Sequence, residues 1–191
     1  MEKEGSSRDG LIAELNDLLR LDHDAVQSYG IAIEHLDAAA HQEKLREFRA
    51  DHERHIEQLS GLIRQQGGKP VGGPHLTTGA VKAAVQQAGR AGGDRGILTA
   101  FKTNERQARD KYRRHAEKGH AGEVGDVVAR GAADEERHYA WVVSVLESIE
   151  GSDAARRATD TMEVGQARAA DAMEAAERKA GEAAEKLGRS R

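Results

Sequence analysis

Two copies of one charged hexapeptide hold most of the residues in this sequence that could do chemistry. Residues 50–55 read ADHERH, and residues 133–138, 83 positions later, read ADEERH. The copies differ at one position, where His52 in the first corresponds to Glu135 in the second. Residues three apart lie on one face of a helix, so each copy presents two groups that bind divalent metals. These pairs are His52 with His55, and Glu135 with His138.

The same 83-residue offset relates residues well outside the hexapeptide. It pairs an acid with an acid, a tyrosine with a tyrosine and a histidine with a histidine: Asp22 with Glu105, Tyr29 with Tyr112, and His55 with His138. Both halves therefore read acid-x-x-Ala-x-x-x-Tyr, followed by a histidine 33 residues after the acid. The sequence predicts that one helical hairpin occurs twice.

Four long helices are expected to position these residues. Apolar residues recur at three- and four-residue spacing in four segments, about 9–39, 42–66, 94–118 and 122–149. Residues 61–96 contain ten of the 21 glycines and both prolines, which predicts a long connection between the second and third helices. A short helix is expected within residues 79–91. The fold class predicted for residues 9–150 is therefore an all-α four-helix bundle with a long crossover.

Helix geometry predicts that six of these side chains converge in the core. In an antiparallel hairpin, residues at equal distance from the turn lie at the same height, which places Asp22 beside His55 and Glu105 beside His138. His52 and Glu135 lie one turn away on the same apolar faces. A lone buried carboxylate costs several kcal/mol. The cluster therefore needs compensation, either from ion pairs with the histidines or from a pair of divalent metal ions.

The chain has an acid on the first and third expected helices, His52-x-x-His55 on the second and Glu135-x-x-His138 on the fourth. This arrangement resembles the di-iron carboxylate pattern of ferritin-like bundles, in which both the second and the fourth helix carry E-x-x-H. The closest resemblance is to rubrerythrin- and bacterioferritin-type domains and their uncharacterised bacterial relatives, over about residues 9–150. It implies that Asp22 and Glu105 are terminal metal ligands, that His55 and His138 each bind one metal, and that Glu135 bridges the two.

His52 departs from that pattern, because it stands where the family has a second bridging glutamate. A neutral imidazole offers one lone pair, whereas a carboxylate offers two oxygens. We therefore expect the two metal positions to be unequal. The resemblance implies that the protein binds one or two Fe(II) ions and oxidises them with dioxygen or peroxide. Such a ferroxidase-like oxidoreductase would serve iron handling or oxidative-stress defence, and manganese also suits these ligands.

Two alternatives remain open at this point. The bundle could be a non-enzymatic, stress-related scaffold with a degenerate metal site. Alternatively, the histidine-rich half could form a mononuclear or zinc site from Asp22, His52 and His55.

Residues around the cluster have roles that the sequence leaves open. Tyr29 and Tyr112 are expected in the core, where either hydroxyl could bond a ligating carboxylate. Charged residues flank the apolar stripe as solvated groups or as outer partners of the ligands: Asp51, Arg54, Asp134 and Arg137.

Composition excludes several other classes of protein. The chain has 191 residues and a net charge of -4 with both signs interspersed, so no nucleic-acid surface is expected. It has no cysteine, which excludes disulfides, iron–sulfur clusters and thiolate zinc sites. No apolar run suits a membrane span and no signal-peptide core is present, so we expect a soluble cytoplasmic protein.

Residues 152–191 are rich in alanine and charge and contain few large apolar residues. They predict an exposed or partly disordered helical tail, which is either a solvated extension or a surface for an unknown partner. A homo-oligomer is compatible with the sequence.

Overall fold

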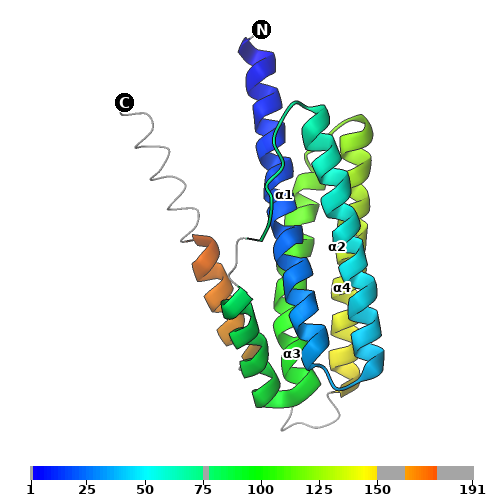
Figure 1. The fold of residues 1–191 in the computed structure, drawn as a ribbon, viewed down its shortest axis with the longest axis vertical. Coiled ribbons are helices and arrows are strands. Elements are labelled where there is room, and N and C mark those ends of the chain that lie inside the picture. Colours follow the sequence, from blue (N-terminus) through cyan, green and yellow to red (C-terminus); the bar gives the residue numbers. More distant parts are fainter. Residues whose placement is uncertain (1, 75–77, 150–161, 176–191) are drawn as a thin grey trace. The chain divides into compact units, whose positions relative to one another are not determined.

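The computed structural model describes residues 2–74, 78–149 and 162–175, in which the regular secondary structure is α-helical, with no strand among these residues (Figure 1). The all-α class predicted from the sequence is confirmed. The chain divides into two compact units, residues 1–149 and 150–191. The first unit contains four elements: α1 (Glu2–His35), α2 (Ala39–Gln65), α3 (Thr78–Ala116) and α4 (Gly122–Ile149).

The four helices of the first unit lie side by side as a helical bundle (Figure 1). Helix α1 packs against α2 and α3, and α4 packs against α3 and α2. Short turns join α1 to α2 and α3 to α4. The second turn contains Gly119 and Gly122 at φ of 66° and 62°, a left-handed conformation that glycine adopts without strain.

The core consists of two apolar clusters. One contains Tyr29, Phe48 and Leu98, and the other contains Leu15, Leu59 and Val128. Between the residues of these two clusters, α1 contains Asp22, α2 contains the hexapeptide 50–55, and α4 contains the hexapeptide 133–138. The helices therefore carry their polar site at a level between two apolar layers.

The connection from α2 to α3 contains the short helix expected within residues 79–91, but this helix is joined to the next one as a single element. Helix α3 begins at Thr78, and its regular conformation is interrupted only at Gly92 and Gly93. The segment before that break buries Val81, Val85 and Ala88, whose helical spacing outweighs the high glycine content. The non-helical part of the connection is held to α1 by Asn16, which donates to the Lys69 carbonyl at 3.2 Å and accepts from the Val71 amide at 2.9 Å.

The ends of α1 differ from the predicted ones. Helix α1 begins at Glu2 instead of residue 9, and it ends at His35 instead of Ala39.

Among the described residues, no helix is both long and apolar enough to cross a membrane. Within the second unit, residues 162–175 form a helix with exposed Val164 and Met173, and the rest of the predicted tail lies outside the described residues.

Two helical glycines provide a test of how tightly the bundle is packed around the site. A Cβ at Gly131 of α4 would lie 2.3 Å from Cε1 of the buried Tyr112 ring, whereas a Cβ at Gly61 of α2 meets no described atom within 4 Å. We predict that Gly131→Ala lowers the free energy of unfolding by about 1–3 kcal/mol. Gly61→Ala, the matched control, raises it by up to about 1 kcal/mol. Urea unfolding of the metal-free protein measures both, and equal effects would contradict this packing.

Candidate metal centre

Six ionisable side chains from all four helices meet in the core. Each is at most 3% exposed: Asp22 on α1, His52 and His55 on α2, Glu105 on α3, and Glu135 and His138 on α4. Two overlapping groups of them offer ligand atoms that lie within 4.8 Å of one another. The first group is Asp22, His52, His55 and Glu135, and the second is His52, Glu105, Glu135 and His138.

The carboxylate of Asp22 is fully engaged by hydrogen bonds. Its Oδ1 lies 2.9 Å from Nδ1 of His52 and 3.4 Å from Nδ1 of His55. Its Oδ2 accepts a bond of 2.7 Å from the Tyr112 hydroxyl. Burial opposes ionisation, but the hydrogen bonds from His52 and His55 outweigh it and lower the pKa of Asp22.

The second group contrasts with this arrangement, because it contains polar atoms without partners. Glu105 Oε1 accepts a bond of 2.6 Å from the Tyr29 hydroxyl. Within the described part of the chain, five other buried atoms here have no hydrogen-bond partner: Glu105 Oε2, both Glu135 oxygens, His138 Nδ1 and His52 Nε2. Such orphaned atoms are rare in the cores of folded proteins, and they are the pattern expected of side chains that bind an ion.

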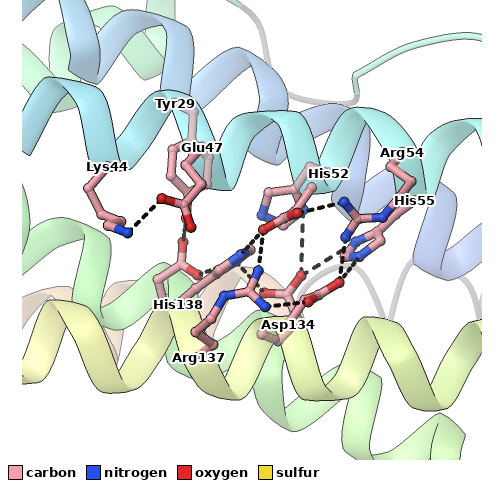
Figure 2. A network of polar contacts seen from close by, with 12 residues as sticks. Tyr29, Lys44, Glu47, His52, Arg54, His55, Asp134, Arg137 and His138 are labelled. Atoms are coloured by element: carbon pink, nitrogen blue, oxygen red, sulfur yellow. Dashed lines mark hydrogen bonds and ion pairs between the residues drawn. The ribbon is translucent and has the colours of Figure 1, made fainter.

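A second layer of charges surrounds the histidines and crosses between the hairpins. Asp51 on α2 lies 3.0 Å from Nε2 of His138 on α4, and Asp134 on α4 lies 3.0 Å from Nε2 of His55 on α2. Arg54 donates to both of these carboxylates, and so does Arg137. Figure 2 shows Arg54 and His55 of α2 facing Asp134 and Arg137 of α4. In this outer layer, His55 and His138 each face an aspartate of the other hairpin that both arginines contact.

These contacts determine which histidine nitrogen carries a proton. Burial opposes ionisation of Asp51, but hydrogen bonds from His138 and Arg54 lower its pKa to about 2, so it can only accept. His138 must therefore donate through Nε2. Burial lowers the pKa of His138 to about 3, so the ring is neutral and its Nδ1 keeps a lone pair. That atom lies 3.6 Å from Glu105 Oε2 and 3.7 Å from Glu135 Oε2.

His55 is in the opposite situation. Both of its nitrogens face carboxylates, Asp22 through Nδ1 and Asp134 through Nε2. Burial disfavours the charged ring, but the hydrogen bond and charge of Asp22 outweigh it and raise the pKa of His55. With both nitrogens donating, the ring has no lone pair to offer.

Glu135 occupies the least favourable electrostatic position in the cluster. Burial, followed by repulsion from Glu105 and Asp22, raises its pKa well above 4.5. Burial also raises the pKa of Glu105. A divalent cation at this position would replace the protons on these acids and neutralise their repulsion.

The structure brings together all six residues that the sequence singled out as candidate ligands. It also resolves the roles left open for their neighbours. The tyrosine hydroxyls reach across to the acid of the other hairpin, and Asp51, Asp134 and the two arginines are outer partners of the histidines. The sequence signal for these partners was their recurrence at the 83-residue offset.

The raised pKa of Glu135 predicts a pH-dependent contribution of this residue to stability. A carboxyl whose pKa is raised by folding stabilises the protein below its unfolded pKa, about 4.5, and that contribution is lost as pH rises through the folded pKa. Glutamine cannot ionise, so Glu135→Gln should escape this loss.

The metal-free Glu135→Gln variant should therefore exceed metal-free wild type in Tm by at least about 2 °C at about pH 8, with a smaller difference at about pH 5. Thermal unfolding followed by circular dichroism in chelator measures this. Glu136→Gln, at the exposed neighbouring position, is the control and should change Tm little at either pH. A constant difference between Glu135→Gln and wild type across this range would contradict the assignment.

Comparison with known proteins supplies a family and no activity. No curated protein matches the chain, and no solved structure does. Residues 11–118, more than half of the chain, match the family described as Domain of unknown function (DUF2383). This range covers Asp22, His52, His55 and Glu105, and it ends before Glu135 and His138. The chain belongs to the DUF2383 family.

Proposed function

We propose that residues 9–150 form a ferritin-like bundle of two repeated hairpins whose buried cluster binds iron. The observation that carries the proposal is the set of five partnerless polar atoms on Glu105, Glu135, His138 and His52. Carboxylate oxygens and neutral imidazole nitrogens are the ligands that iron and manganese use in proteins. The residues present therefore fit such an ion.

The separations within the cluster support the same proposal. At 3.6 and 3.7 Å, the contacts of His138 Nδ1 with Glu105 and Glu135 are too long for hydrogen bonds. Metal–ligand bonds to nitrogen and oxygen are about 2.0–2.2 Å, so two atoms that bind one ion lie no more than about 4.4 Å apart. The observed contacts lie within that limit.

Each group of the protein would have a defined task in this function. Glu105, Glu135 and His138 would hold the ion, and bound iron would supply a redox centre able to react with dioxygen or peroxide. Tyr29 orients the Glu105 carboxylate through its hydroxyl. Asp51 holds His138 in the tautomer that presents Nδ1, as carboxylate partners of metal-binding histidines generally do. The apolar layers on both sides exclude water from the site.

A mononuclear zinc site made from Asp22, His52 and His55 is less well supported. These three residues are bonded to one another, and His55 also faces Asp134. A metal there would have to displace those hydrogen bonds.

The second candidate function is a metal-free helical scaffold. The hydrogen bonds of Asp22 with His52 and His55 favour it, because they satisfy half of the cluster with protein groups alone. The unsatisfied atoms around Glu135 argue against it for the other half.

Metal analysis of untagged protein separates the two functions. We predict that protein prepared anaerobically with Fe(II), then freed of excess ion, retains iron measurable by mass spectrometry, and that Glu105→Gln/Glu135→Gln does not. Glu136→Gln/Glu123→Gln removes the same charge from exposed positions and should retain the wild-type content. Dioxygen uptake on exposure to air then tests oxidation separately. Absence of bound Fe(II), Mn(II) and Zn(II) in the wild type would favour the scaffold.

A further inference from the structure

We propose that the cluster holds a single metal ion, bound by His52, Glu105, Glu135 and His138, while Asp22 and His55 act from outside it as positioning residues. This inference rests on the proposed metal-binding function and assigns the ligands within it. It differs from a metal pair in which Asp22 and His55 serve a second ion.

His52 is the residue on which the assignment depends. Its Nδ1 bonds Asp22 at 2.9 Å, and its Nε2 is buried without a hydrogen-bond partner among the described residues. A histidine that donates one N–H to a carboxylate and presents its other nitrogen is in the arrangement typical of a metal ligand. Asp22 then plays the part for His52 that Asp51 plays for His138.

The two histidines related by the repeat differ in what they can offer. His138 bonds a carboxylate through Nε2 only, and its Nδ1 has no partner in the described chain. His55 faces a carboxylate through each nitrogen, at 3.4 and 3.0 Å. Because ionised carboxylates accept and do not donate, both His55 nitrogens are committed as donors.

The two acids related by the repeat differ in the same direction. Asp22 receives three donors, His52, His55 and Tyr112. Glu105 receives one, Tyr29, and keeps Oε2 free of any described partner. The position near Asp22 is therefore closed by hydrogen bonds, whereas the position near Glu105 is open to a cation.

The one position at which the two hexapeptides differ, His52 in the first and Glu135 in the second, explains this difference. His52 brings a donor to Asp22, and its counterpart Glu135 brings a second acid to Glu105. Two acids side by side repel unless a cation lies between them. Glu105 and Glu135 supply two negative charges for a divalent ion, and Asp22 is balanced by His55.

Manganese binding by the wild-type protein tests the inference without any substitution. Mn(II) titrated anaerobically should saturate at one tight ion per chain, and its paramagnetic resonance spectrum should be that of an isolated ion. A metal pair about 3.5–4 Å apart would couple magnetically. Two tight, coupled ions would overturn the single site and leave the metal-binding function standing, whereas no bound ion would overturn both.

Substitutions matched by the repeat test the ligand assignment. We predict that His138→Gln weakens Mn(II) binding by roughly 100-fold or more, as expected of a lost ligand, and that His55→Gln weakens it by less than about tenfold. Asp22→Asn should fall between them, at about 10–100-fold. Circular dichroism establishes that each variant is folded. Equal losses in His55→Gln and His138→Gln would overturn the assignment.

One gain-of-function variant completes the test. His52→Glu removes the donor from Asp22 and supplies a second carboxylate between the two positions. We expect it to bind two Mn(II) ions per chain with a coupled spectrum. A variant that is folded and still binds a single isolated ion would contradict the role assigned to His52.

Discussion

The rest of this structure depends on one constraint, which is the burial of three acids and three histidines at one level of the bundle. Burial of an uncompensated charge costs several kcal/mol, and a domain has only about 5–15 kcal/mol of net stability. The compensation is visible around each group. Tyrosine hydroxyls bond Asp22 and Glu105, carboxylates bond His55 and His138, and arginines neutralise those carboxylates in turn. Each of these contacts joins one hairpin to the other, so the polar site also holds the two hairpins together.

The compensation is symmetric in its outer layer and asymmetric at its centre. Asp51 with Arg54 and Asp134 with Arg137 repeat the same contacts on opposite sides. At the centre, His52 donates a hydrogen bond to Asp22, while Glu135 places a second acid beside Glu105. A protein optimised only for stability would not keep partnerless carboxylates in its core. Their presence on one side alone is the physical basis for assigning that side to a cation.

Helical periodicity and antiparallel geometry were sufficient to predict the class of fold and the meeting of six side chains. Asp22 and His55, 33 residues apart, are at equal distance from a turn, and this alone places them together. Other features depended on tertiary contacts. Asp51 and Asp134 flank the apolar stripe, and the sequence left them open as solvated groups or outer partners of the ligands. The packing of α2 on α4 decides this, because it brings each aspartate to a histidine of the other hairpin. The helix before Gly92 was expected as a short element within residues 79–91, but its packing into the core through Val81, Val85 and Ala88 was not. The sequence could not predict that the position near Asp22 is closed, because this depends on the directions of individual hydrogen bonds, which residue spacing does not define.

Anomalous diffraction from crystals grown anaerobically with Fe(II), recorded at the iron absorption edge, tests the central claim most directly. The account predicts one strong anomalous peak per chain, within bonding distance of His138 Nδ1, the Glu105 and Glu135 carboxylates and His52 Nε2. It also predicts that Asp22 and His55 keep their hydrogen bond to each other. Two peaks of comparable strength, a peak between Asp22 and His55, or no peak in the core would contradict it.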